Sequence, residues 1–115
     1  MRRGEIWLVN LDPTIGAEIK KTRPSAIVND DAIGILPLKV IVPLTEWKDR
    51  YAVAPWMVRV EPDAENGLKN TSAADAFQVR SVAQERLVQR LGKLSDATMP
   101  KITAALAVVL CIEVE

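Results

Sequence analysis

The sequence contains no histidine and only one cysteine, Cys111, among its 115 residues. A disulfide within the chain is therefore impossible, and a free thiol fits a reducing compartment. A zinc site, which is normally built from histidine and cysteine, is close to excluded, and we expect no metal site and no cofactor. Catalysis by histidine is excluded as well. Any chemistry must then depend on arginine, lysine, threonine, serine, tyrosine or carboxylates.

Long apolar runs and a net charge are also missing. No run approaches the roughly 18 residues that a membrane-spanning helix needs, and the first residues lack the apolar stretch of a signal peptide. We therefore expect a cytoplasmic protein with no membrane partner. Fifteen basic residues balance fifteen acidic ones, whereas many nucleic-acid-binding domains are strongly basic. Composition alone thus does not indicate an RNA-binding protein.

The residues that are present predict one mostly β domain spanning residues 1–115. Hydrophobic residues make up 49% of the chain, which is ample for a core in a domain of this length. Runs rich in β-forming residues predict strands at 5–11, 25–29, 38–44, 56–60 and 77–82. The run at 38–44 is almost continuously apolar, as is typical of a strand buried on both faces.

Alternation predicts which side chains share a face in two of these strands. At 56–60, Met57 and Arg59 face one way and the other three residues face the opposite way. At 77–82, the alternation groups Phe77, Val79 and Ser81 against Gln78, Arg80 and Val82.

The apolar period changes to three and four residues near the C-terminal end of the chain. This spacing predicts a helix with one apolar side, formed by Met99, Ile102, Leu106, Val109 and Leu110. Ser95 or Thr98 can cap its start, and Pro100 is tolerated because it lies in the first turns. Five or six short strands and one packed helix predict a small barrel or a strongly bent sheet.

Two features exceed what folding requires. The segment Lys20-Lys21-Thr22-Arg23 places three cations at a junction between a loop and a strand, and Thr45 ends the most apolar strand. A guanidinium offers a planar fork to two phosphate oxygens, and a hydroxyl can donate to a third atom. The pair could therefore bind a phosphodiester, and RNA supplies its own nucleophile, the 2′-hydroxyl, so that cleavage needs no metal.

Simpler interpretations remain open for the same residues. A Lys-Lys-Thr-Arg loop is usually a solvated turn, and Thr45 can end a strand and cap the segment that follows. Glu18 is an exposed loop carboxylate by default, and Arg80 can belong to an exposed strand face. From residue chemistry alone, the chain is a mostly β domain with a plausible anion site.

The order and spacing of several short motifs resemble those of the MazF/PemK toxins, or mRNA interferases. The resemblance begins at Arg3-Gly4-Glu5-Ile6-Trp7 and includes the stretch from Asp12 to Glu18. It is strongest at Thr22-Arg23-Pro24 followed by Ala26-Ile27-Val28-Asn29, and it goes on at Val42-Pro43-Leu44-Thr45. It continues through Gly67-Leu68-Lys69, Gln78-Val79-Arg80-Ser81, Arg86-Leu87 and Leu91-Gly92 to the C-terminal helix. The resemblance covers essentially the whole chain.

The resemblance implies an SH3-like barrel with a C-terminal helix, working as a homodimer that cleaves single-stranded RNA to 2′,3′-cyclic phosphate and 5′-hydroxyl ends. It places the catalytic arginine on Arg23 and the catalytic hydroxyl on Thr45, with Glu18 a candidate general base. It also implies RNA contacts from Gln78, Arg80 and the mobile loop, in which the candidates are Thr14, Gly16, Lys20, Lys21 and Thr22. A MazE-like antitoxin with an acidic, initially disordered tail is the implied partner.

Two other functions remain possible on the same fold. A gyrase poison of the CcdB type uses a C-terminal tryptophan motif, and this chain has no tryptophan after Trp56. A non-catalytic barrel that binds RNA or a peptide would not require the Arg23/Thr45 pair. The RNA sequence that is recognised cannot be read from these residues.

Overall fold

A computed structural model describes residues 1–33 and 35–113. It contains seven strands and one α-helix: β1 (Glu5–Asn10), β2 (Thr22–Ile27), β3 (Leu38–Glu46), β4 (Met57–Val60), β5 (Ser72–Asp75), β6 (Arg80–Ala83), β7 (Leu87–Lys93) and α1 (Met99–Leu110). Short 3₁₀ segments connect some of them: η1 (Asp31–Ile33), η2 (Asp49–Val53), η3 (Ala76–Gln78) and η4 (Gln84–Arg86). The expectation of a mostly β fold with a C-terminal helix is confirmed.

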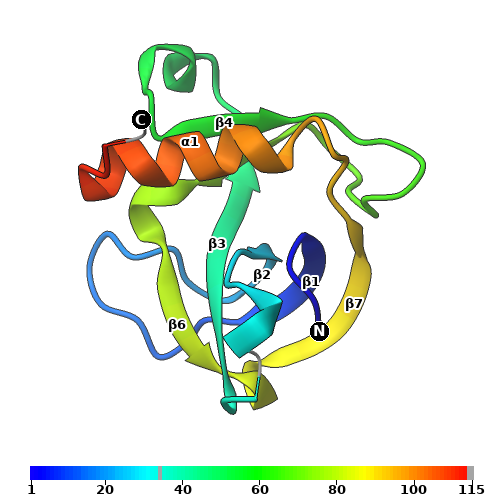
Figure 1. Cartoon of the computed structure of the whole chain (residues 1–115). Helices are drawn as coiled ribbons and strands as arrows, with labels where there is room; N and C mark the ends of the chain where they lie inside the picture. Colours follow the sequence, from blue (N-terminus) through cyan, green and yellow to red (C-terminus); the bar gives the residue numbers. More distant parts are fainter. Residues whose placement is uncertain (34, 114–115) are drawn as a thin grey trace.

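All strand pairs in the sheet are antiparallel, and the path runs β4-β5-β3-β2-β1-β7, with β6 also paired to β3. Within the described residues the end strands β4 and β7 do not pair with each other. The sheet is therefore strongly bent but open, in agreement with the small barrel or strongly bent sheet that the residue pattern predicted. Figure 1 shows β3 running through the middle of the molecule, with β6 and β7 curving away on either side.

Strand β3 is central because it changes partner along its length. Residues 38–41 pair with β6, residues 41–43 pair with β2, and residues 44–46 pair with β5. Ile41 packs in one hydrophobic cluster and Val42 in the other. The expectation of a strand buried on both faces is confirmed, and it explains why this run is almost continuously apolar.

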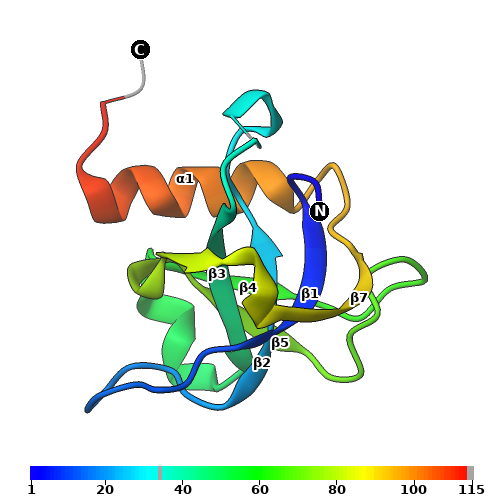
Figure 2. The same ribbon diagram turned by 90° about the horizontal axis from the view of Figure 1, so that it is seen from below.

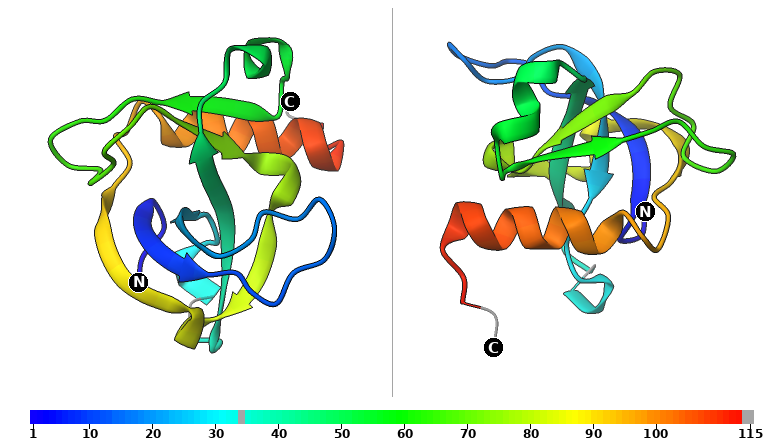
Figure 3. Two further views of the ribbon diagram at one scale, coloured as in Figure 1. Left: turned by 180° about the vertical axis from the view of Figure 1, so that it is seen from behind. Right: turned by 90° about the horizontal axis from the view of Figure 1, so that it is seen from above.

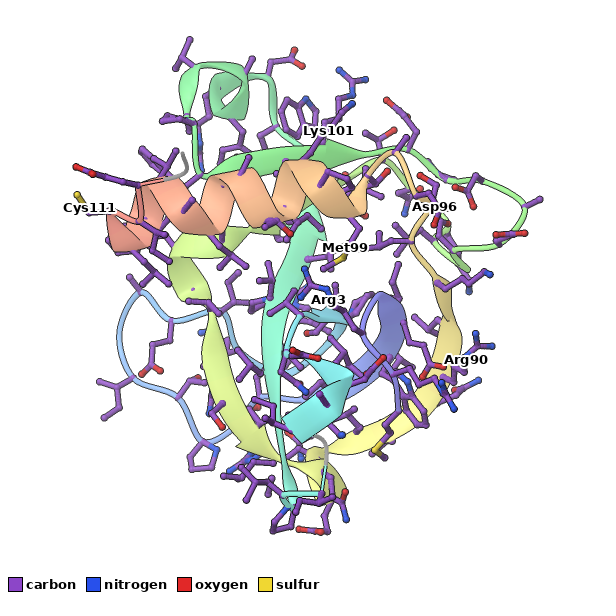
Figure 4. All side chains as sticks on the ribbon, in the orientation of Figure 1. Arg3, Arg90, Asp96, Met99, Lys101 and Cys111 are labelled. Carbon is purple, nitrogen blue, oxygen red and sulfur yellow. The ribbon has the colours of Figure 1, made fainter. Side chains whose placement is uncertain are left out.

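Helix α1 covers one side of the bent sheet, as Figures 1 and 2 show. Ile102 and Ala105 are buried against the larger cluster, and Met99, Leu106 and Val109 pack at its margin. Figure 4 shows Met99 and Lys101 on different sides of the helix, and Lys101 lies beside β4, where it lines a hollow with Met57 and Arg59. No helix in ranges 1–33 and 35–113 is long and apolar enough to cross a bilayer.

The helix boundaries follow from local chemistry. The Ser95 hydroxyl accepts a hydrogen bond from the Thr98 backbone at 3.2 Å, and Pro100 lies in the first turn. Cys111 ends the helix in the left-handed conformation, with φ 55°. The predicted apolar side was wrong at Leu110, which is 56% exposed, because its neighbour Val109 occupies the position against the core in this last turn.

Strands β5 and β7 were not predicted, and the predicted strand at 77–82 starts too early. Its first residues form η3, so Phe77 is exposed while Val79, which was predicted on the same face, packs against the larger cluster. The turn of η3 breaks the two-residue alternation on which the prediction depended. In β4, by contrast, Val58 and Val60 are buried and Arg59 is exposed, as the alternation predicted.

Candidate active site

Arg23 and Thr45 lie on the neighbouring strands β2 and β3. The register pairs Ser25 with Pro43, and continuing it by two residues brings Arg23 opposite Thr45. Residues opposite each other in an antiparallel pair place their side chains on the same face. Both residues accordingly line one cavity of about 550 Å³. The structure thus brings together the two residues that the sequence singled out.

The cavity combines cations, hydrogen-bonding groups and an apolar wall. Its other lining residues are Leu8, Pro24, Leu44, Glu46, Gly67, Leu68, Lys69, Asn70, Ser72, Gln89 and Leu91. Lys69 adds a second cation to Arg23, and Glu46 is the only acidic residue in this lining. Two cations beside hydroxyl and amide groups suit an anionic phosphodiester, and the leucine side chains can contact a sugar or a base.

The loop that carries Lys69 is fixed by internal hydrogen bonds. Asn66 is buried, and its side-chain amide donates to the Glu61 carbonyl at 2.8 Å. Its side-chain oxygen accepts from the Leu68 backbone at 3.0 Å. Gly67 adopts φ +70°, and a Cβ there would lie 2.2 Å from the Leu91 carbonyl oxygen. Only glycine fits both requirements, so the loop can pack against β7 and form one side of the cavity.

Sequence reasoning missed Lys69, Glu46 and Gln89 as cavity residues. The Asn66-Gly67 pair is a turn signal, and it was available in the sequence, but it does not reveal which strand the turn approaches. That information depends on the contact with β7, which is far away along the chain.

The predicted RNA-binding loop lies outside the Arg23 cavity. None of the five predicted loop residues lines that cavity. Four of them are exposed and one is partly exposed: Gly16, Lys20, Lys21 and Thr22, and then Thr14. Lys21 has φ 71°, and its N–H donates to the Asp12 carboxylate at 3.1 Å. The loop is linked to the site through one contact, in which Arg23 Nε donates to the Lys20 carbonyl at 3.2 Å.

Glu18, Gln78 and Arg80 line a second cavity of about 470 Å³, not the one that holds Arg23. The Gln78 side chain accepts from the Ile19 N–H at 2.6 Å and donates to the Ala17 carbonyl at 3.1 Å. Arg80 donates to the Leu11 carbonyl at 3.2 Å. Glu18 accepts from the Ile15 N–H at 2.8 Å. In this structure the three side chains therefore hold the loop between β1 and β2, which Figure 3 shows extending beside β6.

Asp75 supports the segment that carries Gln78. It is buried at the start of η3 and accepts a hydrogen bond from the Phe77 N–H at 3.1 Å. Burial raises the pKa of Asp75, although the backbone N–H groups of Phe77 and Gln78 oppose this rise. Across residues 1–33 and 35–113, no group of three or more histidine, cysteine or acidic side chains is placed to hold a metal ion.

The sequence of this chain matches a known protein family. The family model of PemK-like, MazF-like toxins of type II toxin–antitoxin systems matches residues 2–110. Endoribonuclease MazF9 of Mycobacterium tuberculosis is 35% identical over 112 residues, which cover 92% of each chain. Endoribonuclease PemK of Escherichia coli is 33% identical, and the match covers 96% of this chain and 82% of PemK.

Solved structures agree with the sequence relatives. An endoribonuclease in complex with its cognate antitoxin, from a mycobacterial species, has a TM-score of 0.80 and 25% identity, covering 100% of this chain and 99% of that one. MazF of Deinococcus radiodurans has a TM-score of 0.80 at 20% identity, covering 97% of each chain, and supports the fold alone. With a family model that matches nearly the whole chain and relatives above 30% identity, the chain belongs to the PemK-like, MazF-like toxins of type II toxin–antitoxin systems.

Proposed function

We propose that this toxin is an endoribonuclease that cuts single-stranded RNA in the Arg23/Thr45 cavity without a metal ion, leaving a 2′,3′-cyclic phosphate and a 5′-hydroxyl. The observation that carries the proposal is that Arg23 and Thr45 line one cavity beside Lys69. The relatives named as endoribonucleases support the same activity. No cofactor is needed, because the substrate contains its own nucleophile.

In this mechanism Arg23 binds the scissile phosphate and stabilises the negative charge that develops on its oxygens. A planar guanidinium suits this role because it donates to two oxygens at once and stays protonated. Thr45 donates to a phosphate oxygen or orients the 2′-hydroxyl in line with the departing 5′-oxygen. Lys69, which lines the same cavity, adds a second positive charge.

The general base is a carboxylate, and the structure offers two. Glu18 was expected from the sequence, but it lines the other cavity and its Oε1 already accepts from Ile15. Glu46 directly follows Thr45 and is the acidic residue in the lining of the Arg23 cavity. We therefore assign the base to Glu46 and keep Glu18 as the alternative to be tested beside it.

The exposed cations Lys20 and Lys21 contact phosphates that flank the cleaved one, with Thr14, Gly16 and Thr22 completing this outer surface. Such contacts are sequence-independent and weaken as salt is raised. Gln78 and Arg80 were also expected to contact RNA. The hydrogen bonds of Gln78 to Ile19 and Ala17 favour a structural role for this side chain.

The partners of this toxin follow from its family. The mycobacterial relative is solved in complex with its cognate antitoxin, and we propose that a MazE-like antitoxin neutralises this chain. We also propose a homodimer. Exposed apolar side chains support this, including Trp56 and Phe77, whose rings lie 6.2 Å apart. We propose a cytoplasmic location, because the proposed substrate, mRNA, is found there. Sedimentation analysis tests the dimer.

The experiment that tests the function is incubation of purified toxin with a long single-stranded RNA in EDTA. Discrete cuts with 5′-hydroxyl ends are expected, and mapping them gives the recognised sequence. An RNA that stays intact in the presence of the folded dimer would instead favour a non-catalytic binding module or a gyrase poison. Slower migration of the RNA on a native gel, caused by bound protein, would support the binding module. Inhibition of DNA supercoiling by gyrase would support the gyrase poison.

A further inference from the structure

Gln78 joins two parts of the molecule that are distant in the sequence. Its side chain lies on η3, and both ends of its amide group bond to the backbone of the loop between β1 and β2. The two bonds, 2.6 Å to Ile19 and 3.1 Å to Ala17, use the acceptor and one donor of the amide. Ala17 and Glu18 are otherwise exposed. The Gln78 side chain is therefore a latch that holds an exposed loop.

The latched segment leads directly to Arg23. Lys20 follows Ile19, and the Lys20 carbonyl accepts from Arg23 Nε at 3.2 Å. On the other side of Lys20, the Lys21 N–H donates to Asp12 at 3.1 Å, and the Lys21 carbonyl accepts from the Leu11 N–H at 2.9 Å. The carbonyl that holds the guanidinium thus lies between two anchored residues. Gln78 provides the anchor on the loop side.

We propose that Gln78 is a positioning residue for Arg23, acting through the Lys20 carbonyl and not through contact with RNA. This inference rests on the proposed function of Arg23. With Nε held by Lys20, the two terminal nitrogens of the guanidinium remain free to bind the phosphate. If the latch opens, the Lys20 carbonyl is held on the Lys21 side alone, and the guanidinium loses part of its fixed orientation. Misplacing a catalytic group by about 1 Å can cost on the order of 100-fold in rate.

The latch is built from rigid parts at its base. Asp75 accepts from the Phe77 N–H and so holds the start of η3. The next residues continue into β6, where Arg80 pairs with Ile41 of β3. Gln78 therefore projects from a segment fixed to the central strand, whereas residues 15–18 of the loop it holds are exposed and only Ile19 packs against the smaller cluster. Gln78 therefore restricts the movement of the loop, and the loop does not position Gln78.

The test compares Gln78→Met with Gln84→Met in the otherwise unchanged toxin. Methionine has similar length and cannot form either hydrogen bond, and the Gln84 side chain belongs to neither cavity. We expect Gln78→Met to lower kcat on the order of 10- to 100-fold while KM changes less than about twofold, and Gln84→Met to leave both unchanged. Gln78→Glu keeps the acceptor for Ile19 and should recover part of kcat. A rise in KM with an unchanged kcat would mean that Gln78 contacts RNA and would overturn the proposal.

A second measurement does not depend on ribonuclease activity. Trypsin can cut after Lys20 and Lys21 in the latched loop, and after Lys69 as an internal reference. We expect Gln78→Met to accelerate cutting at Lys20 and Lys21 relative to Lys69. Unchanged trypsin cutting at Lys20 and Lys21 would show that Gln78 does not hold the loop, and this result does not depend on the proposed ribonuclease function. Faster cutting with an unchanged kcat would show that the loop is held by Gln78 but does not position Arg23. If the methionine variant does not fold, Gln78→Asn, too short to make both bonds, takes its place.

Discussion

Thr45 of β3 stands across from Arg23 of β2 at the point where β3 leaves one partner strand for another. Ser25 and Pro43 are the last pair of the β2–β3 ladder on this side, and Thr45 itself pairs with Ala73 of β5. Pro24, between Ser25 and Arg23, has no N–H to continue the ladder. The two strands can therefore separate here, and the side chains of Arg23 and Thr45 face the resulting cavity.

Replacing Arg23 tests the main source of charge stabilisation in the cavity. Arg23→Ala should lower the cleavage rate by at least about 100-fold, comparable to losing a preorganised donor in a transition state. Arg23→Lys keeps the charge but not the planar fork, so its rate should remain well below that of the wild type. Initial rates on a fluorescent RNA measure both. Equal activity of the lysine variant and the wild type would contradict a role for the fork.

Thr45 should contribute through its hydroxyl and not through its methyl group. Thr45→Ala is expected to lose nearly as much activity as Arg23→Ala, whereas Thr45→Ser keeps the hydroxyl and should retain most of it. Thr45 is only partly buried, so the fold should survive both changes, as circular dichroism can check. Loss of activity in the serine variant equal to that in the alanine variant would show that the hydroxyl is not what matters.

The two candidate bases can be separated by a matched pair of substitutions. Glu46→Gln should lower the rate by about 100-fold or more, which is the usual contribution of a general base. Glu18→Gln should leave the rate unchanged, since Glu18 lies at the other cavity. Initial rates on the same fluorescent RNA measure both variants. The opposite pattern would return the role to Glu18.

Asp75 should make stability depend on pH. Burial raises the pKa of Asp75 in the folded protein, so its protonated form stabilises the fold at low pH, and this contribution is lost as the pH rises through the raised pKa. Asp75→Asn imitates the protonated form. Its urea midpoint should exceed that of the wild type at pH 7, and the difference should shrink towards pH 4. Glu85→Gln, at an exposed carboxylate, should show no such trend.

The sequence predicted the parts of the fold that depend on strong local patterns. The apolar run of β3, the alternation of β4 and the spacing of α1 each identify their own element. Strand β5, with the sequence Ser-Ala-Ala-Asp, has no β-branched or aromatic residue and lacks such a pattern. It forms because β3 and β4 lie on its two sides, which is a property of the assembled sheet.

The candidate site also contains residues that local sequence patterns identify and residues that only the folded structure brings in. Arg23 and Thr45 stand out in the sequence because one ends a basic loop and the other ends a buried strand. Lys69 and Gln89 reach the cavity only when the loop after β4 packs against β7. The role of Gln78 depends on a contact with Ile19, far away in the sequence. No local pattern contains either contact, so the resemblance to RNA-binding relatives suggested a different role for Gln78.

The most direct test of the central claim uses an RNA oligonucleotide that contains one cleavage site. The nucleotide on the 5′ side of the scissile phosphate is replaced by its 2′-deoxy form, and cutting is measured in EDTA. Removing this single hydroxyl removes the proposed nucleophile, so we expect binding to persist and cleavage to disappear, as it should for Arg23→Ala on the unmodified RNA. Continued cutting of the 2′-deoxy substrate at the same phosphate would contradict the account.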